Sequence, residues 1–535
     1  MMEWGQYQAS ASVMMALLKM PAAWLQLSLL YLAPTVNFQC AQPVNKSFPS
    51  SNITQEELVF DNSCCFKDEE DQLQFCQQFH YDRRDFTNTV NMMWDLVCER
   101  EFLVTFAQVS FMCGVTGGNI LGGLAAARVG RKPVLVVALL LMPLLSAVVA
   151  VVPTFPLFLL FRFLLGLALG GTIFISFILG NELASGPWRA PISILHQVPF
   201  GIGKIIFGLT AYFLRDWREI QMALAVYSLI FLPYCWLIEE SPQWLMSKGK
   251  LKRAERVTTA IHRRNGLPAI QTEMQPMAEK QKVEIVRTEP TKVANSCRIK
   301  ETKTLSLCGA LCVPRLRRYV LSTWITWYLA GLSFFALNAN MPQWGGGVVG
   351  GTINIAIGGL IGGIPGNIAT IFLVRRFGRK KVTIVAHIFA ALFSFLLPIY
   401  DIGEQPEDWQ RRVTGFLSLI AMSVAYPSLF LMSGELIPDE VKLPVMTVAN
   451  IMARLGNTTA PLVGPTSVFH RALPLWIIGT APIISSSLLV WLPETKNKPM
   501  PKTVKDILTS KRGPDKNMSE DEDQKLKKLM TECES

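Results

Sequence analysis

Two cations deep in apolar stretches are the residues of this sequence best suited to bind an anion. Lys204 lies near the centre of the stretch 191–213 and Arg454 lies within 444–468, whereas no Asp or Glu falls in the middle of any long apolar stretch. A low dielectric makes each fixed charge count strongly in selecting a substrate of opposite charge. We therefore expect both cations to bind a substrate anion. For Lys204 a second interpretation stays open, in which its stem carries the ammonium to an interface.

Aromatic and amide side chains gather in apolar stretches of the C-terminal part of the chain. Aromatic faces stack on flat organic molecules and attract an ammonium group by cation–π interaction, so together with Arg454 they suit a zwitterion. The alternative interpretation is helix packing or an interfacial aromatic belt. Besides Arg454 and Lys204, the candidate substrate-binding residues are Trp327, Tyr328, Phe334, Phe335, Asn367 and Tyr426.

Charges at the ends of apolar stretches predict salt bridges that gate a pore. Two basic turns, 128–132 and 376–380, share the pattern Arg-x-Gly-Arg-Lys, and Glu182 and Glu435 each precede a cation by seven residues. Such bridges would hold one mouth of the pore shut while the other is open. An intramembrane arginine followed by two glycines joins this group, with helix packing and a structural ion pair as its alternative. The candidate gating residues are Arg128, Arg131, Arg162, Glu182, Arg189, Arg376, Arg379, Glu435 and Lys442.

These motifs recur in the same order along the chain and so define a repeat. The second basic turn follows the first by 248 residues, Gly434-Glu435-Leu436 follows Asn181-Glu182-Leu183 by 253, and Glu494 follows Glu240 by 254. Three ordered matches indicate a duplication. Parallel six-helix repeats are a transporter construction, with the substrate site near the midplane between the halves.

Composition agrees with a membrane protein. Half of the residues are hydrophobic, 17% are charged and the mean hydropathy is +0.31. Apolar stretches long enough to cross a ~30 Å hydrocarbon core recur along the chain. We predict an all-α membrane protein with twelve transmembrane helices in two six-helix halves, 1–238 and 319–494, a cytoplasmic linker at 239–318 and a tail at 495–535. The predicted spans are 12–36, 102–127, 133–152, 156–181, 191–213, 220–238, 319–342, 350–374, 382–400, 413–434, 444–468 and 473–492.

Loop charge predicts the orientation. The linker carries 17 Lys/Arg against 8 Asp/Glu, whereas the loop 39–101 carries 12 Asp/Glu against 5 Lys/Arg. The positive-inside rule then places the linker and both termini in the cytoplasm and the loop outside. Acceptor triplets at Asn45 and Asn52 predict glycosylation of this loop. The oxidising side favours at least one disulfide among the five cysteines in or at the edge of the loop, Cys40, Cys64, Cys65, Cys76 and Cys98.

Enzyme, metal and nucleic-acid functions find no support in the motifs. The glycines of 345–350 fit a dinucleotide fingerprint by spacing, but they lie between two apolar stretches with no strand before them. No Gly-Lys-Ser/Thr phosphate loop is present, and the five His lack metal-site spacing. The net charge of +11 resides largely on segments expected in the cytoplasm. We expect no catalytic residues, no metal, no cofactor and no nucleic-acid partner.

Four sequence runs carry a family resemblance. Gly5-Gln6-Tyr7-Gln8, Trp94 to Arg100, Glu240-Ser241-Pro242-Gln243-Trp244-Leu245 and Leu492 to Lys496 resemble the organic cation, anion and zwitterion transporter family of the major facilitator superfamily. The resemblance covers the chain nearly end to end, except for about 267–305 and the tail beyond about 507. It implies twelve helices, an alternating-access cycle, plasma-membrane residence and small organic ions as cargo.

Departures from the family pattern affect the expected gate and substrate. Ala127 and Arg375 stand where an Asp usually precedes the arginine of a basic turn, so both halves lack an acidic partner. Arg454 resembles the anion and carnitine-type members, since cation members commonly have Asp there, whereas Asn367 stands where anion carriers have a cation. A transport-deficient receptor or scaffold with the same fold therefore stays open.

Together these observations predict a secondary transporter of small organic ions in the plasma membrane. Organic anions or carnitine-like zwitterions are the expected substrates, and an organic cation transporter is the alternative. The expected partners are the small organic ion and the lipid bilayer. A coupling ion or exchange anion is left undefined.

Overall fold

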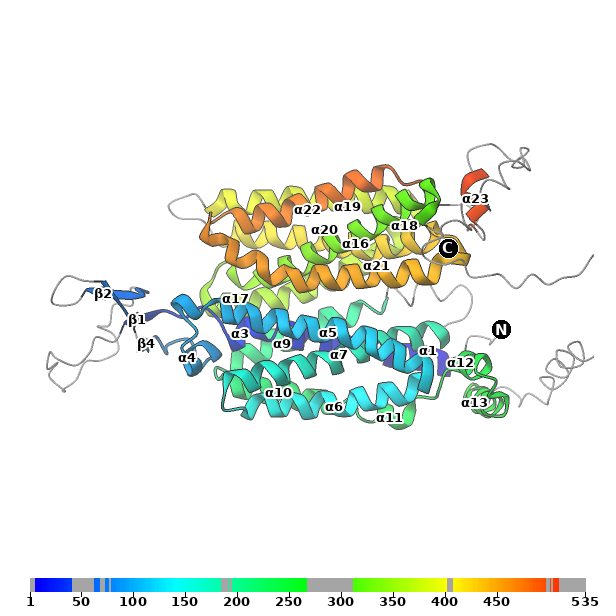
Figure 1. Cartoon of the computed structure of the whole chain (residues 1–535), viewed down its shortest axis with the longest axis horizontal. Helices are drawn as coiled ribbons and strands as arrows, with labels where there is room; N and C mark the ends of the chain where they lie inside the picture. Colours follow the sequence, from blue (N-terminus) through cyan, green and yellow to red (C-terminus); the bar gives the residue numbers. More distant parts are fainter. Residues whose placement is uncertain are drawn as a thin grey trace, which may run out of the picture.

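The protein is a bundle of long helices in two halves, which lie side by side along the long axis of the computed structural model (Figure 1). The structure describes residues 5–40, 62–67, 73–76, 78–183, 192, 195–266, 311–401, 408–496, 501 and 504–509. We call the end that carries the strands the strand end, and the end that carries α12 (Pro242–Ser247), α13 (Leu251–Arg264) and α23 (Val504–Thr509) the linker end.

The closest helix pair of the N-terminal half is α5 with α7. The half contains α1 (Gln6–Leu17), α2 (Met20–Leu27), α3 (Leu29–Leu32), α5 (Phe102–Val129), α6 (Arg131–Val151), α7 (Phe155–Leu183), α9 (Val198–Phe213), α10 (Trp217–Leu229) and α11 (Tyr234–Leu237). Glycines of α5 and α7 bring the two backbones together: a Cβ on Gly170 would meet the carbonyl oxygen of Val115. Small residues at such a seam permit this close approach between helices in a membrane.

The C-terminal half repeats the pattern with four short segments that are not α-helical. It contains α16 (Pro314–Asn340), η3 (Met341–Gln343), α17 (Gly347–Ile357), a π-helix (Gly358–Gly363), α18 (Ile364–Phe377), α19 (Arg379–Leu396), η5 (Leu397–Asp401), α20 (Asp408–Leu436), α21 (Asp439–Thr459), a 3₁₀ segment (Ala460–Val468) and α22 (Leu473–Val490). The predicted spans 350–374 and 444–468 are therefore each interrupted by a change of helix type. Such irregularity is tolerated at membrane depth where surrounding protein satisfies the backbone.

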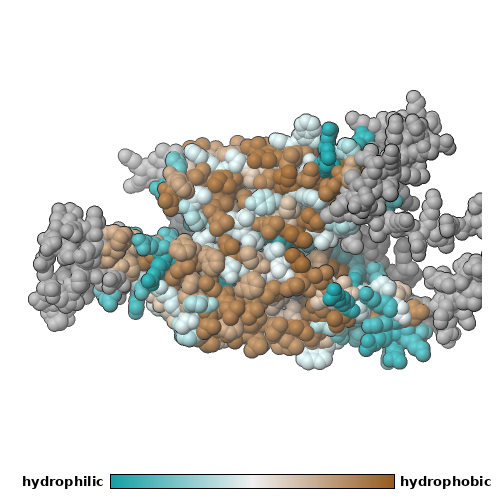
Figure 2. All heavy atoms as spheres, in the orientation of Figure 1, coloured by the Kyte–Doolittle hydropathy of each residue, from teal (hydrophilic) through white to brown (hydrophobic). Residues whose placement is uncertain are grey.

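Ten helices in the described ranges are long and apolar enough to cross a membrane. The shorter apolar helix α9, together with α21 and the 3₁₀ segment that follows it, occupies the two remaining predicted spans. Figure 2 shows hydrophobic residues over the middle of one face and hydrophilic residues gathered toward its ends. The all-α membrane fold predicted from the sequence is confirmed.

Short strands and two disulfides shape the strand end. The strands β1 (Phe38–Cys40) and β4 (Phe79–Tyr81) pair antiparallel, as do β2 (Cys65–Lys67) and β3 (Leu73–Phe75). Disulfides join Cys40 to Cys76 and Cys64 to Cys98, and Cys65 is a free thiol. The predicted disulfide bonding of this loop is confirmed. The glycosylation candidates Asn45 and Asn52 lie outside the described residues.

At the linker end, the first residues of α1 are hydrogen-bonded to residues of the linker. Asn265, which follows α13, accepts a hydrogen bond from the Tyr7 N–H at 2.8 Å and donates one from its amide to Gln8 Oε1 at 2.8 Å. The Tyr7 hydroxyl accepts a bond from the Glu239 N–H, and the Arg264 guanidinium lies over the Tyr7 ring. The first turn of a helix leaves backbone N–H groups unpaired. Asn265 satisfies one of them from 258 residues away.

Candidate functional site

A cavity of about 290 Å³ lies between the two halves. Its described lining includes three cations, Lys19, Lys204 and Arg454, and no Asp or Glu. The first two come from the N-terminal half and Arg454 comes from α21 of the C-terminal half. An anion entering this cavity meets unopposed positive charge in a region of low dielectric.

A proline break in the first span brings Lys19 to this cavity. The helix α1 ends at Leu17, and α2 begins at Met20 with Pro21 in its first turn. Proline has no N–H to donate to the carbonyl four residues earlier, and its ring crowds that carbonyl. The chain therefore kinks at Leu18 and Lys19, and the lysine side chain lines the cavity.

Lys204 and Arg454 are held differently. The Lys204 ammonium donates a hydrogen bond to Asn338 Oδ1 at 2.9 Å, across the two halves, and the residue is only 1% exposed. This direct partner excludes the interpretation in which Lys204 reaches an interface. The Arg454 Nε is buried with no hydrogen-bond partner. Within the described chain its guanidinium is therefore available to a ligand in the cavity.

Aromatic rings form one wall of the cavity. The Trp327 ring lies edge-on to Tyr426 at 5.9 Å between centroids, and Phe334 contacts Tyr426 at 5.7 Å. The Trp327 indole N–H is used by Ser433, so its ring faces rather than its polar edge remain for a ligand. Such a wall suits the apolar body of an organic ion.

The cavity is bounded differently at its two sides. Toward the strand end, Gln26 and Phe335 line both this cavity and a second one of about 560 Å³, so these two side chains separate the two spaces. Toward the linker end, Phe177 of α7 and Phe430 of α20 meet edge-on at 5.5 Å across the halves. Each precedes the glutamate near the end of its helix by five residues. This aromatic contact, which we did not predict, forms the floor of the cavity.

Seven of the eight predicted substrate-binding residues line the cavity, namely Lys204, Trp327, Phe334, Phe335, Asn367, Tyr426 and Arg454. Tyr328 is the exception. Its hydroxyl lies 3.0 Å from Thr459 Oγ1, and its carbonyl lies where a Cβ on Gly456 would be. The residue therefore packs α16 against α21 and lies outside the described lining of this cavity.

Lys19 was missed because the predicted first span was displaced. The span predicted as 12–36 puts Lys19 near one end, whereas the helical segment runs from Gln6 to Leu32 and Lys19 is its midpoint. A charge at the centre of an apolar span is by itself a sign of a functional residue.

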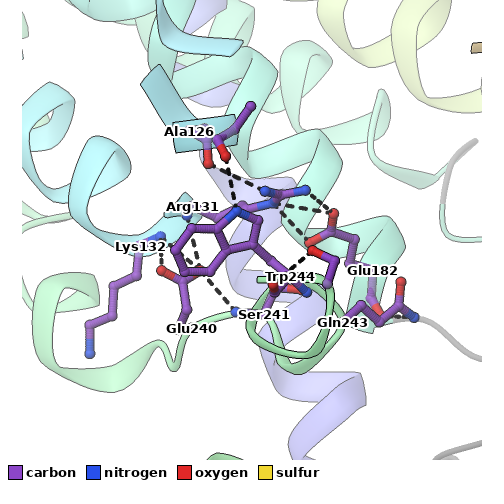
Figure 3. Close-up of polar contacts among 10 residues, drawn as sticks. Ala126, Arg131, Lys132, Glu182, Glu240, Ser241, Gln243 and Trp244 are labelled. Atoms are coloured by element: carbon purple, nitrogen blue, oxygen red, sulfur yellow. Dashed lines mark hydrogen bonds and ion pairs between the residues drawn. The ribbon is translucent and has the colours of Figure 1, made fainter. Parts of the chain in front are cut away.

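The basic turn of the N-terminal half is the centre of a charge cluster at the linker end (Figure 3). The Arg131 guanidinium pairs with Glu182 at 2.8 Å, and both side chains are 18% exposed. The Glu240 carboxylate accepts the backbone N–H groups of Arg131 and Lys132, which open α6. A carboxylate at a helix N-terminus is favourable because the unpaired N–H groups and the helix dipole both attract it. Trp244 of α12 caps the cluster by donating its indole N–H to the Ala127 carbonyl.

The C-terminal half builds the same cluster. Arg379 pairs with Glu435 at 3.0 Å, and Glu494 accepts the Arg379 N–H at 2.9 Å. Burial alone would raise the pKa of Glu494, but hydrogen bonds from the backbone N–H groups of Lys496, Arg379, Lys380 and Lys381 outweigh it, so the pKa is lowered. Glu494 therefore stabilises the fold at neutral pH, and this contribution is lost as pH falls through its lowered pKa.

Glycine at the third position of each basic turn explains why the pattern recurs. Gly130 has φ +130° and Gly378 has φ +98°, a region that L side chains rarely adopt. These turns let one helix end and the next begin at once, with the following arginine aimed at its glutamate.

The predicted gating residues fall into three groups. Arg131 pairs with Glu182 and Arg379 pairs with Glu435, although the sequence had singled out the cations seven residues after each glutamate. Each pair lies within one half, so neither bridges the mouth directly. Arg128 and Arg376 are exposed at the linker end, Lys442 lies in the first turn of α21, and Arg189 lies outside the described residues.

Arg162 lies far from the charge clusters at the linker end. It lies twenty residues before Glu182 on α7, about 30 Å along the helix at 1.5 Å per residue. The side chain is fully buried, 3.3 Å from Ser28 Oγ and 3.4 Å from Gln108 Oε1, with its guanidinium over the Phe111 ring. Its contacts hold the N-terminal half together.

We expect a double-mutant cycle on Arg131 and Glu182 to show a coupling energy of about 1–2 kcal/mol in thermal unfolding of the purified protein. The pair is charge-assisted and mostly sheltered from water, so it should exceed the ~0–1 kcal/mol of a surface pair. The pair Arg264–Glu239, whose side chains are 46% and 26% exposed, is the control and should couple more weakly. Equal coupling in the two cycles would show that shelter from water does not strengthen the Arg131–Glu182 pair.

Comparison with known proteins places this geometry in context. The model of the sugar (and other) transporter family matches residues 58–503. The rabbit (Oryctolagus cuniculus) organic anion transporter 3 is 30% identical, over 78% of this chain and 74% of that protein. An organic cation transporter-like protein of Drosophila melanogaster is 26% identical, over 94% of this chain and 90% of that protein. The Escherichia coli xylose transporter XylE in a partially occluded inward-open conformation superposes with a TM-score of 0.61 at 16% identity, covering 92% of this chain and 99% of that chain, which shows a shared fold.

Proposed function

We propose, for a chain that belongs to the sugar (and other) transporter family, that it carries small organic anions across the plasma membrane by alternating access, without ATP hydrolysis. Members of this family are multi-pass membrane transporters rather than enzymes. Relatives named for organic anions and for organic cations both match the chain. Their names favour an organic ion as the substrate. The sign of its charge follows from the residues that line the cavity.

The positive charge of the cavity supports an anionic substrate. Lys19, Lys204 and Arg454 line it, and the described lining contains no carboxylate. Among the residues that the structure describes, Lys204 alone of the three has a hydrogen-bond partner for its cationic group, and that partner is a neutral amide. A cationic substrate would have to enter against three like charges, whereas a carboxylate or sulfonate would relieve their repulsion.

A zwitterion with a quaternary ammonium group is the second candidate. The rings of Trp327, Phe334 and Tyr426 stand close enough together to hold such a group by cation–π attraction. Its carboxylate would lie at Arg454. The ammonium would still meet the cations of the N-terminal half, so we rank anions first.

The direction of the chain in the membrane follows from its charges and disulfides. We place the strand end, with two disulfides, outside the cell and the basic linker end in the cytoplasm, together with both termini. An epitope at the C-terminus should then be stained only after cells are permeabilised.

Uptake by the purified protein in liposomes tests the function. We expect a labelled aromatic monocarboxylate to accumulate in a saturable manner without ATP, and unlabelled carboxylates and sulfonates to compete. A trimethylammonium zwitterion should enter more slowly and a quaternary ammonium cation slowest. Transport of the cation alone would overturn the anion proposal and leave the transporter family intact. Protein that is correctly folded but moves none of the three would favour a receptor or scaffold.

A further inference from the structure

Lys19 lies at the middle of the first candidate membrane span. It is the midpoint of the helical segment Gln6–Leu32, about 20 Å along the helix from either end. A lysine stem extends only several ångströms, so its ammonium does not reach an interface by snorkelling. The Pro21 break turns it toward the cavity that the two halves share.

The Lys19 ammonium has no hydrogen bond or ion pair with any residue of the described chain. Its electrostatic neighbours are the Arg454 guanidinium and the His196 ring, with no acidic group among them. Arg454 likewise has a buried Nε without a partner. Within the described chain these two cations line one cavity from opposite halves with no acidic residue in its lining, so they repel, and the repulsion is strong at low dielectric.

We propose that Lys19 and Arg454 form a two-cation clamp, one cation from each half, that binds a single anionic group of the substrate. This inference rests on the proposed function and deepens it. The ligand class is an organic molecule whose head group carries two or three equivalent anionic oxygens, such as a carboxylate, sulfonate or sulfate ester. Arg454 offers a planar fork for two of these oxygens, and Lys19 offers a compact point charge.

An anion bound at the clamp should also raise the thermal stability of the protein. One bound group neutralises cations of both halves, so it replaces repulsion across their interface by attraction. A ligand that binds the folded state and draws two parts of it together raises thermal stability by mass action. Lys204, whose ammonium already donates to Asn338, contributes background charge to the cavity and stands outside the clamp.

Replacing Lys19 by Gln tests the clamp. We expect K19Q to raise the KM for a labelled aromatic monocarboxylate at least about tenfold with a maximal rate within about twofold of wild type. K19R should keep most of the affinity because the charge survives. The thermal stabilisation of wild type by saturating monocarboxylate should be lost in K19Q and retained in K19R. The exposed cation Lys252 on α13 supplies the matched control, so K252Q should equal wild type in both measurements.

The outcomes separate this inference from the proposed function. Wild type that transports the monocarboxylate, with K19Q unchanged in KM and in thermal shift, would overturn the clamp alone. Wild type that neither transports nor is stabilised by any carboxylate or sulfonate would overturn the anion function and the clamp with it. If K19Q fails to reach the membrane, K19M, with a straight apolar side chain, takes its place in both measurements.

Discussion

Arg454→Asp protein should reach the cell surface and take up organic anions at least about tenfold more slowly than wild type. The substitution removes a guanidinium that lines the cavity and puts a carboxylate among Lys19 and Lys204. Losing a charge-assisted contact costs on the order of 1.5–3 kcal/mol, and ~1.4 kcal/mol corresponds to a factor of ten in binding. Initial uptake rates, normalised to surface-biotinylated protein, measure the effect.

Two variants bracket this result. Arg454→Lys should keep part of the uptake because the charge survives while the planar fork is lost. Reversing the charge of Arg471, which is exposed near the start of α22 and outside the cavity, should leave uptake near the wild-type rate. Normal anion uptake by well-delivered Arg454→Asp protein would rule out the assigned charge selectivity.

The sequence predicted the fold well where physical chemistry is periodic or compositional. Apolar length located the spans, and the repeated basic turns marked the repeat. The arginines and glutamates at the ends of the spans were predicted only as a group, and the structure supplies the pairs Arg131–Glu182 and Arg379–Glu435. The start of the first helix was placed too late because Gln6, Tyr7 and Gln8 are polar. Their helical state depends on Asn265, a contact that hydropathy does not contain.

The types of residue that line the cavity were predicted well. The directions in which individual side chains point were predicted less well. Membrane helices that are apolar all round carry little amphipathic signal to show which face is inward. Trp327 and Tyr328 are adjacent in sequence and so point about 100° apart on α16, and only tertiary contacts decide which one faces the cavity. Lys19 lines the cavity because the helix breaks just before Pro21. The sequence alone did not show that this break directs the lysine toward the cavity.

Gly170→Val should abolish delivery of the folded protein to the surface. Even the first carbon of the new side chain would meet the Val115 carbonyl oxygen and lie 3.0 Å from the Asn119 nitrogen, both of them backbone atoms that a rotamer change does not move. Overpacking ordinarily costs about 1–3 kcal/mol and more against backbone, out of a total stability of roughly 5–15 kcal/mol. Surface biotinylation and size-exclusion profiles of detergent extracts measure the loss.

Gly434→Val is the matched control for this substitution. Gly434 also lies inside a long helix, α20, yet a Cβ built on it meets nothing within 4 Å. The helix-propensity cost of valine is therefore shared, and only the clash differs. Equal delivery of the two variants would mean that α5 and α7 do not depend on close backbone contact.

The hydrogen bond between Asn265 and the first helix can form only after the whole N-terminal half has been translated. The ribosome makes Tyr7 early and Asn265 only after every span of the N-terminal half has been translated. The first helix therefore gains this hydrogen bond only when the spans of its half have been made. The unit that closes on itself is therefore 5–265, beyond the last span of that half. A gene split at residue 238 would separate the opening helix from the side chain that accepts the Tyr7 N–H, whereas a split after residue 266 would keep Tyr7 and Asn265 in one fragment.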